Sequence, residues 1–81
     1  MKKALVLGAS GGMGQAIVNE LVNRKIEVVV FARNKAKLNT LYGDIDLVSI
    51  VSGDALNKDD LDKAMTDVDT IFHALNIPYS Q

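Results

Sequence analysis

The sequence predicts an α/β fold, in which a parallel sheet carries helices on both faces. Four short apolar segments, rich in β-branched residues, alternate with three helix-periodic segments, and a glycine-rich turn joins the first strand to the first helix. Nearly continuous apolar character is typical of parallel strands buried on both sides. With right-handed crossovers the strands take the order 3-2-1-4, which is about half of a doubly wound fold.

The expected strands cover residues 3–7, 26–32, 46–51 and 69–75. The expected helices cover about 12–24, 34–42 and 57–66, each near the length that a crossover requires. Asn34 and Asn57 are expected N-caps, and Asp59 and Asp60 then fall in a first turn, where the helix dipole favours them. Gly43 suits the end of the second helix.

Composition excludes several classes of function. The 81 residues make one small domain with a net charge of −1, which disfavours nucleic acid and anionic membranes as partners. With no cysteine and a single histidine, neither a disulfide framework nor a metal cluster is expected. The apolar stretch before Gly8 is far shorter than a signal peptide or membrane span requires, so we expect a cytoplasmic protein.

The glycine-rich turn at residues 8–14 reads Gly-Ala-Ser-Gly-Gly-Met-Gly, between a strand and a helix. Gly8 can adopt backbone angles closed to other residues, and Gly14 lets the helix pack closely on the strand. Gly11 or Gly12 lets the main chain approach a pyrophosphate, which the N–H groups and dipole of the helix then face. This context predicts nucleotide binding.

Two features of the turn leave alternatives open. No register fits the Gly-x-Gly-x-x-Gly pattern, so a purely structural βα turn is the alternative. Ser10 either donates its hydroxyl to a phosphate oxygen or stabilises the turn locally. The expected nucleotide contacts of the turn are Gly8, Ser10, Gly11, Gly12, Met13 and Gly14.

Four segments together carry a resemblance to a known family: residues 8–14, Phe-Ala-Arg-Asn-Lys-Ala-Lys at 31–37, Gly-Asp-Ala-Leu at 53–56 and Val-Asp-Thr-Ile-Phe-His-Ala-Leu at 68–75. Through them the chain resembles the short-chain dehydrogenase/reductase superfamily, most of all its extended and atypical branches, which include NAD(P)-dependent epimerase/dehydratase and NmrA-like proteins. The resemblance covers the whole chain as the N-terminal half of that family's domain. It implies a Rossmann-like fold and a nicotinamide dinucleotide.

The end of the second strand indicates which dinucleotide is favoured. NAD sites usually place Asp or Glu about 20 residues after the glycine turn. Arg33 holds that place here, with Lys35 and Lys37 following. A guanidinium binds a 2′-phosphate bidentately and an ammonium adds charge, so we expect NADP rather than NAD. The resemblance agrees, since related members use an Arg with a Lys four residues later; a solvated basic helix start is the alternative.

The resemblance implies further cofactor contacts at two other strand ends. Asp54, with Ala55 beside it, lies where similar proteins bind the adenine amino group, and a turn or capping aspartate is the alternative. The fourth strand ends at the carboxyl edge of the sheet, where ligands bind in open α/β folds. The residues expected there, beside the cofactor ribose, are Ala74, Leu75 and Asn76; a plain strand terminus is the alternative.

We expect no catalytic residue in this chain. His73 lies in an apolar strand, where a lone histidine is more often structural. The resemblance implies a catalytic Tyr followed by Lys four positions on, and neither Tyr42 nor Tyr79 has that lysine. The chain alone is therefore expected to lack oxidoreductase turnover.

The sequence thus predicts an NADP-binding half-domain over residues 1–81, the N-terminal part of a longer short-chain-type oxidoreductase or epimerase-like protein. One alternative is a non-catalytic redox-sensing or regulatory module like the NmrA-like proteins, and another is a structural domain that only self-associates. A downstream Tyr-x-x-x-Lys would favour the enzyme. Because the fourth strand is an apolar open edge, we also expect a homodimer through it and the tail at 76–81.

Overall fold

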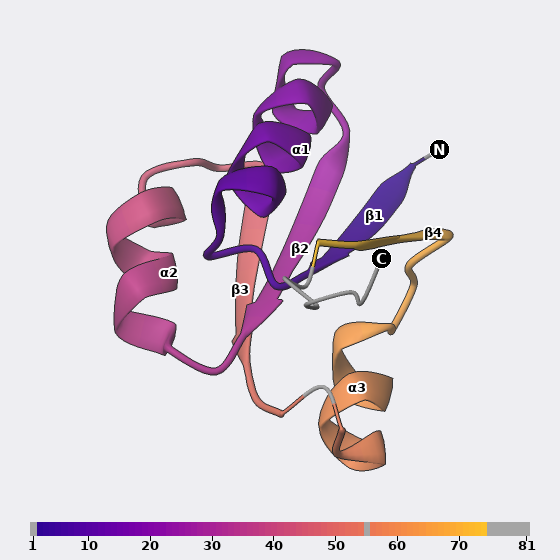
Figure 1. The fold of residues 1–81 in the computed structure, drawn as a ribbon. Coiled ribbons are helices and arrows are strands. Elements are labelled where there is room, and N and C mark those ends of the chain that lie inside the picture. The colour runs from indigo at the N-terminus through magenta and orange to yellow at the C-terminus, as the bar shows by residue number, and fades with distance from the viewer. Residues whose placement is uncertain (1, 55, 75–81) are drawn as a thin grey trace, which may run out of the picture.

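The computed structural model describes residues 2–54 and 56–74. Within these residues, strands and helices alternate as β1 (Lys3–Leu7), α1 (Gly12–Asn23), β2 (Glu27–Ala32), α2 (Lys35–Tyr42), β3 (Val48–Ser52), α3 (Lys58–Ala64) and β4 (Thr70–His73). All neighbouring strands of this part pair in parallel, in the order β3-β2-β1-β4 (Figure 1). The predicted α/β fold and strand order are confirmed.

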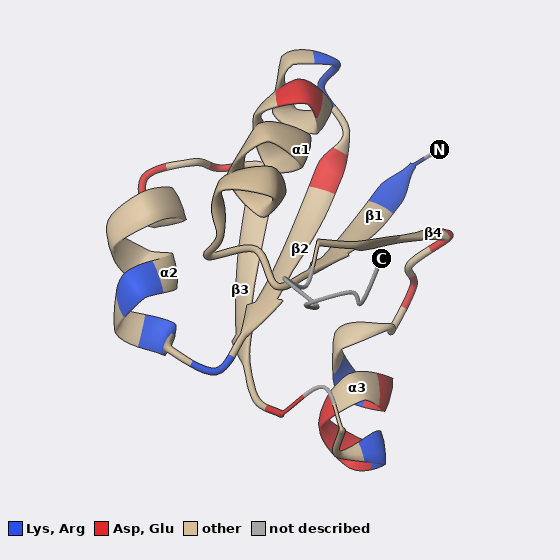
Figure 2. Cartoon of the chain, in the orientation of Figure 1, with Lys and Arg blue, Asp and Glu red and all other residues tan. Residues whose placement is uncertain are grey.

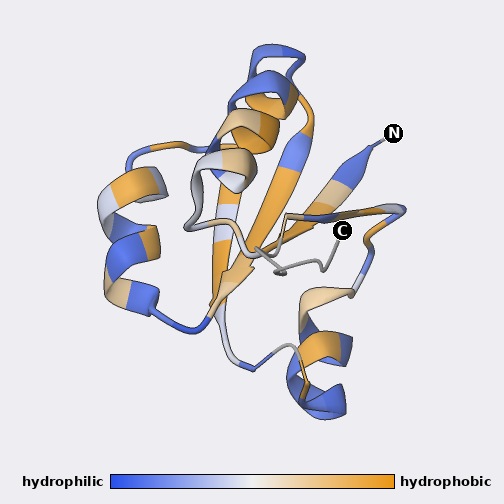
Figure 3. Ribbon diagram, in the orientation of Figure 1, coloured by the Kyte–Doolittle hydropathy of each residue, from blue (hydrophilic) through white to orange (hydrophobic). Residues whose placement is uncertain are grey.

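Helices cover both faces of the sheet because successive residues of a strand point to opposite sides. On one face Val6 packs in a core that includes Leu38 and residues of α1. On the other face Leu5 packs with Ala64 of α3. Figure 3 shows the apolar residues concentrated along the strands and the inward sides of the helices. The two cores hold the sheet between the helices, and parallel pairing brings the carboxyl ends of the strands to one edge.

The expected ranges differ from the structure at several element ends. The third strand begins at Val48 rather than at residue 46, because the Val48 N–H donates to the Ile45 carbonyl at 3.0 Å and closes a turn first. The third helix ends at Ala64 rather than at residue 66, and Asp67 just beyond it has a left-handed φ of 62°. Apolar periodicity alone did not reveal these turns.

Side-chain caps begin two of the helices as predicted. The Asn34 side chain accepts a hydrogen bond from the Lys37 N–H at 3.1 Å. The Asn57 side chain accepts hydrogen bonds from Asp59 and Asp60 at 2.9 and 3.2 Å. Gly43 caps the end of α2 with an ordinary right-handed φ of −60°. Arg33 thus lies just before the Asn34 cap of α2, and Asp54 lies three residues before the Asn57 cap of α3.

Candidate functional site

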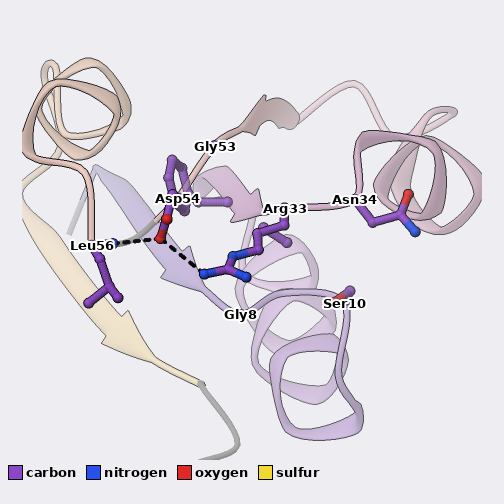
Figure 4. A pocket seen from close by; sticks show the side chains of 9 residues that line it. Gly8, Ser10, Arg33, Asn34, Gly53, Asp54 and Leu56 are labelled. Carbon is purple, nitrogen blue, oxygen red and sulfur yellow. Dashed lines mark hydrogen bonds and ion pairs between the residues drawn. The ribbon is translucent and has the colours of Figure 1, made fainter.

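A pocket of about 420 Å³ lies where the loops after β1, β2 and β3 meet (Figure 4). Because the strands are parallel and in register, their carboxyl ends open at the same edge. Ligands of open α/β sheets bind at this edge. The residues lining the pocket are Gly8, Ser10, Phe31, Ala32, Arg33, Asn34, Gly53, Asp54 and Leu56.

Gly8 and Gly14 have the structural roles that the sequence predicts. Gly8 has a left-handed φ of 73°, and its N–H donates to the Phe31 carbonyl at 2.9 Å. This anchors the turn to the end of β2. A Cβ on Gly14 would lie 2.6 Å from the Gly8 carbonyl oxygen and 2.7 Å from the Ala9 Cα, which no side chain could tolerate without a backbone shift. The close approach of α1 to the turn therefore requires glycine at position 14.

Gly11 and Gly12 are not required by packing. A Cβ on Gly12 would meet nothing within 4 Å, and the nearest contact for Gly11 would be an ordinary 3.8 Å. Gly11 is also the N-cap of α1, and no side chain caps this helix end. The open backbone therefore leaves room for an anion beside the first-turn N–H groups, which attract negative charge.

Arg33 and Asp54, 21 residues apart in sequence, meet at the pocket. An Arg33 Nη2 lies 3.4 Å from Oδ1 of Asp54, and both side chains are exposed. The same Oδ1 accepts a hydrogen bond from the Leu56 N–H at 2.9 Å, while the Asp54 N–H donates to Asp60 at 3.1 Å. The Leu56 hydrogen bond, with further help from Arg33, lowers the pKa of Asp54 despite partial desolvation. A guanidinium and a carboxylate thus face the same cavity.

Other predicted residues lie away from the pocket lining. Lys37 is exposed in the first turn of α2, a helix on which Figure 2 shows basic residues in blue. Met13 is exposed in the first turn of α1. Ala74 is buried, and its N–H donates to the Leu7 carbonyl at 2.8 Å, which fits the plain strand terminus. Of the residues singled out from the sequence, four lie outside the described part of the chain: Ala55, Leu75, Asn76 and Tyr79.

The roles of two residues near the site were not predicted from the sequence. Leu56 is 89% exposed and lines the pocket, so it offers an apolar surface to a ligand. Tyr42, at the end of α2, is 3% exposed and donates its hydroxyl to the Ala9 carbonyl at 2.6 Å. Burial raises the pKa of Tyr42. No short sequence pattern reveals either role. The position of Leu56 depends on a loop, and the Tyr42 hydrogen bond joins residues that are 33 positions apart.

Two kinds of site find no support in the part of the chain that the structure describes. No group of three or more His, Asp or Glu side chains there could hold a metal ion. Among the same residues, no helix is long and apolar enough to cross a membrane. His73 is exposed at the end of β4.

Comparisons with known proteins agree with this geometry. A family model described as NAD(P)H-binding matches residues 8–80. An uncharacterised oxidoreductase of Staphylococcus aureus is 36% identical over 78 residues, which are 94% of this chain and 34% of that relative. The chain thus spans about a third of the length of the curated relatives it matches.

Solved structures give the same result. A Rossmann-fold NAD(P)-binding family protein from Shigella flexneri matches with a TM-score of 0.80 and 34% identity, over 93% of this chain and 38% of that one. A short chain dehydrogenase from Bacillus anthracis matches with a TM-score of 0.77 and 25% identity, over 86% of this chain and 34% of that one. The chain therefore belongs to the NAD(P)H-binding family, in the extended, NmrA-like branch of the short-chain dehydrogenase/reductase superfamily, and is a nicotinamide dinucleotide-binding domain.

Proposed function

We propose that the chain binds NADP(H) in preference to NAD(H), as the cofactor-binding part of a longer short-chain-type oxidoreductase or epimerase-like protein. The observation that carries the proposal is Arg33, which lines the pocket at the end of β2, where an NAD site usually has a carboxylate. The proposal of a longer protein rests on coverage, since the chain spans 34% of an oxidoreductase relative.

Different residues at the pocket would bind different parts of the proposed ligand. The glycine turn and the N-terminus of α1 would hold the pyrophosphate, because unpartnered amides and the helix dipole favour an anion there. Arg33 would bind the 2′-phosphate, with Lys37 adding positive charge nearby. The Asp54 carboxylate would accept a hydrogen bond from the adenine amino group, and Leu56 would pack against the base. When bound, the nicotinamide would supply hydride transfer, and the protein would orient it.

The ion pair between Arg33 and Asp54 is compatible with this role. It is solvent-exposed and 3.4 Å long, and such pairs contribute little to stability. Opening it therefore costs little, so the guanidinium can turn to a phosphate, which offers it a better bidentate partner.

Calorimetric titration with NADP⁺ and NAD⁺ tests the proposal. A charge-assisted bidentate contact is worth on the order of 1.5 to 3 kcal/mol, so wild type should prefer NADP⁺ roughly ten- to hundredfold. Arg33→Ala should abolish the preference. Arg24→Ala is a matched control, because Arg24 also forms an exposed ion pair, with Glu20 on α1. Equal affinities in wild type, or an unchanged ratio in Arg33→Ala, would refute the NADP assignment.

We also propose that the open edge at β4 associates with a second copy. Within the described residues β4 pairs only with β1, and Ile71 is 39% exposed. On the opposite face of β4, Phe72, Ile26 and residues of α1 line a groove of about 390 Å³, whose lining also includes the ion-paired Glu20 and Arg24. Burying such surface at about 25 cal/mol per Å² favours dimers. Sedimentation equilibrium at micromolar concentration checks this, and a well-folded monomer of 8.7 kDa would contradict it.

The near-neutral charge supports a narrower part of the proposal. With a net charge of −1, the chain has no general field that would draw it to nucleic acid. We accordingly propose that it acts on small-molecule chemistry without nucleic-acid partners, and we keep the cytoplasm as its proposed location.

A further inference from the structure

The buried hydroxyl of Tyr42 reaches the glycine turn from the far end of α2. It donates to the Ala9 carbonyl oxygen at 2.6 Å, with Tyr42 and Ala9 both buried. The ordinary tyrosine pKa of 10.0 already keeps the hydroxyl protonated at neutral pH, and burial raises the pKa of Tyr42 further. The Gly8 N–H anchors the start of the turn to the Phe31 carbonyl at 2.9 Å, whereas the contacts nearer Ser10 are longer: the Ala9 N–H lies 3.4 Å from the Phe31 carbonyl, and Gln15 donates to the Ser10 carbonyl at 3.3 Å.

The Tyr42 hydrogen bond fixes the orientation of one peptide group. In a planar trans peptide the N–H points opposite to the C=O. Holding the Ala9 carbonyl toward Tyr42 therefore points the Ser10 N–H away from Tyr42. Ser10 lines the pocket, and the uncapped end of α1 follows two residues later. One buried hydroxyl thus sets the direction of a backbone donor beside the anion position.

We propose that Tyr42 is a positioning residue for pyrophosphate binding, which holds the glycine turn in its anion-binding conformation before the ligand arrives. This inference rests on the proposed nucleotide-binding function and adds a residue to it. A turn that is already ordered loses less conformational freedom on binding, so the hydrogen bond increases affinity without touching the ligand. The effect is confined to ligands that contact the turn.

Two probes separate the turn from the rest of the pocket. ADP carries a pyrophosphate, whereas 2′-AMP carries the 2′-phosphate and adenine without one. Tyr42→Phe removes only the hydroxyl. Thr40→Val is a matched control, because the Thr40 hydroxyl lies on the same helix and donates to the Ala36 carbonyl at 3.0 Å, away from the turn.

Calorimetry on the whole chain should show that Tyr42→Phe weakens ADP binding roughly three- to tenfold, the range that one hydrogen bond supports. Its affinity for 2′-AMP should stay within about twofold of wild type, and Thr40→Val should match wild type for both probes. Equal ADP affinity in wild type and Tyr42→Phe would overturn the inference. Equal losses for ADP and 2′-AMP would also overturn it, since they indicate a structural role alone. Wild type that bound neither probe would overturn the proposed function itself.

A second measurement needs no substitution at Tyr42. The unmutated chain labelled with 3-fluorotyrosine carries two reporters, Tyr42 and Tyr79, and Tyr79→Phe assigns their fluorine signals. The Tyr42 signal should be single and narrow in the ligand-free chain and stay close to that position on addition of ADP, because the turn is already ordered. A Tyr42 signal that is broad or split in the ligand-free chain and becomes single only with saturating ADP would overturn the inference, even if Tyr42→Phe failed to fold.

Discussion

The glycine turn contains two pairs of glycines that the structure distinguishes. Gly8 and Gly14 are required by the fold, one for its φ of 73° and the other because a Cβ would lie 2.6 Å from a backbone oxygen. Gly11 and Gly12 have room for a side chain. A single motif therefore combines residues that build the turn with residues that keep its surface bare, and only the second pair points to a ligand.

The largest effect expected from this comparison is the loss of stability in Gly14→Ala. The added methyl meets the Gly8 carbonyl and the Ala9 Cα, which are backbone atoms that cannot rotate away. Overpacking of this kind costs about 1 to 3 kcal/mol, and more where the backbone must move. A small domain has about 5 kcal/mol of stability in total. Urea denaturation should show a strongly lowered midpoint, and a change below about 0.5 kcal/mol would contradict the packing role.

Gly12→Ala, the same substitution two residues earlier, should leave stability intact and instead lower the affinity for ADP. Its methyl has no neighbour within 4 Å, and alanine replaces glycine at the start of α1. Stability should therefore stay the same or rise by about 0.5 to 1 kcal/mol. Affinity for ADP should nevertheless fall about tenfold or more, because the methyl occupies the space where the main chain approaches the pyrophosphate. Unchanged ADP affinity would show that the bare surface at Gly12 has no part in binding.

The sequence predicts the turn-building glycines and the fold well, because both depend on local signals. Strand and helix periodicity, the Asn34 cap and the strand order all follow from residue types at fixed spacing. The contacts that complete the site are different. The 2.6 Å bond from Tyr42 to Ala9 and the ion pair from Arg33 to Asp54 join residues 33 and 21 positions apart, and only the folded chain brings them together.

The predicted element ends fail for a related reason. Val48 and Ala64 mark boundaries set by turn hydrogen bonds rather than by apolar character. Likewise, sequence position alone could not separate Arg33, which lines the pocket, from Lys37, which lies outside the lining. Arg33 precedes the helix, in the loop after β2, whereas Lys37 lies in the first turn of α2.

Asp54 belongs to both classes of the comparison, since it shapes its loop and lines the pocket, and the smallest expected effect separates the two roles. Its folded pKa lies below the ordinary 3.8, chiefly because its carboxylate accepts the Leu56 N–H. The charge therefore stabilises the fold above pH 3.8, and this contribution is lost as the pH falls through the lower folded pKa. Asp54→Asn removes the charge and keeps an oxygen that can accept the same hydrogen bond.

The urea midpoint of wild type should accordingly exceed that of Asp54→Asn by a small margin at pH 6, and the two should converge as the pH falls below 3.8. Asp69, whose pKa is lowered chiefly by the Lys2 N–H, is present in both proteins and cancels in the difference. A difference that stayed constant across this range would mean that the carboxylate charge adds nothing to the loop. The position of Asp54 would then be set by its backbone hydrogen bonds alone, and its charge would serve only the ligand and Arg33.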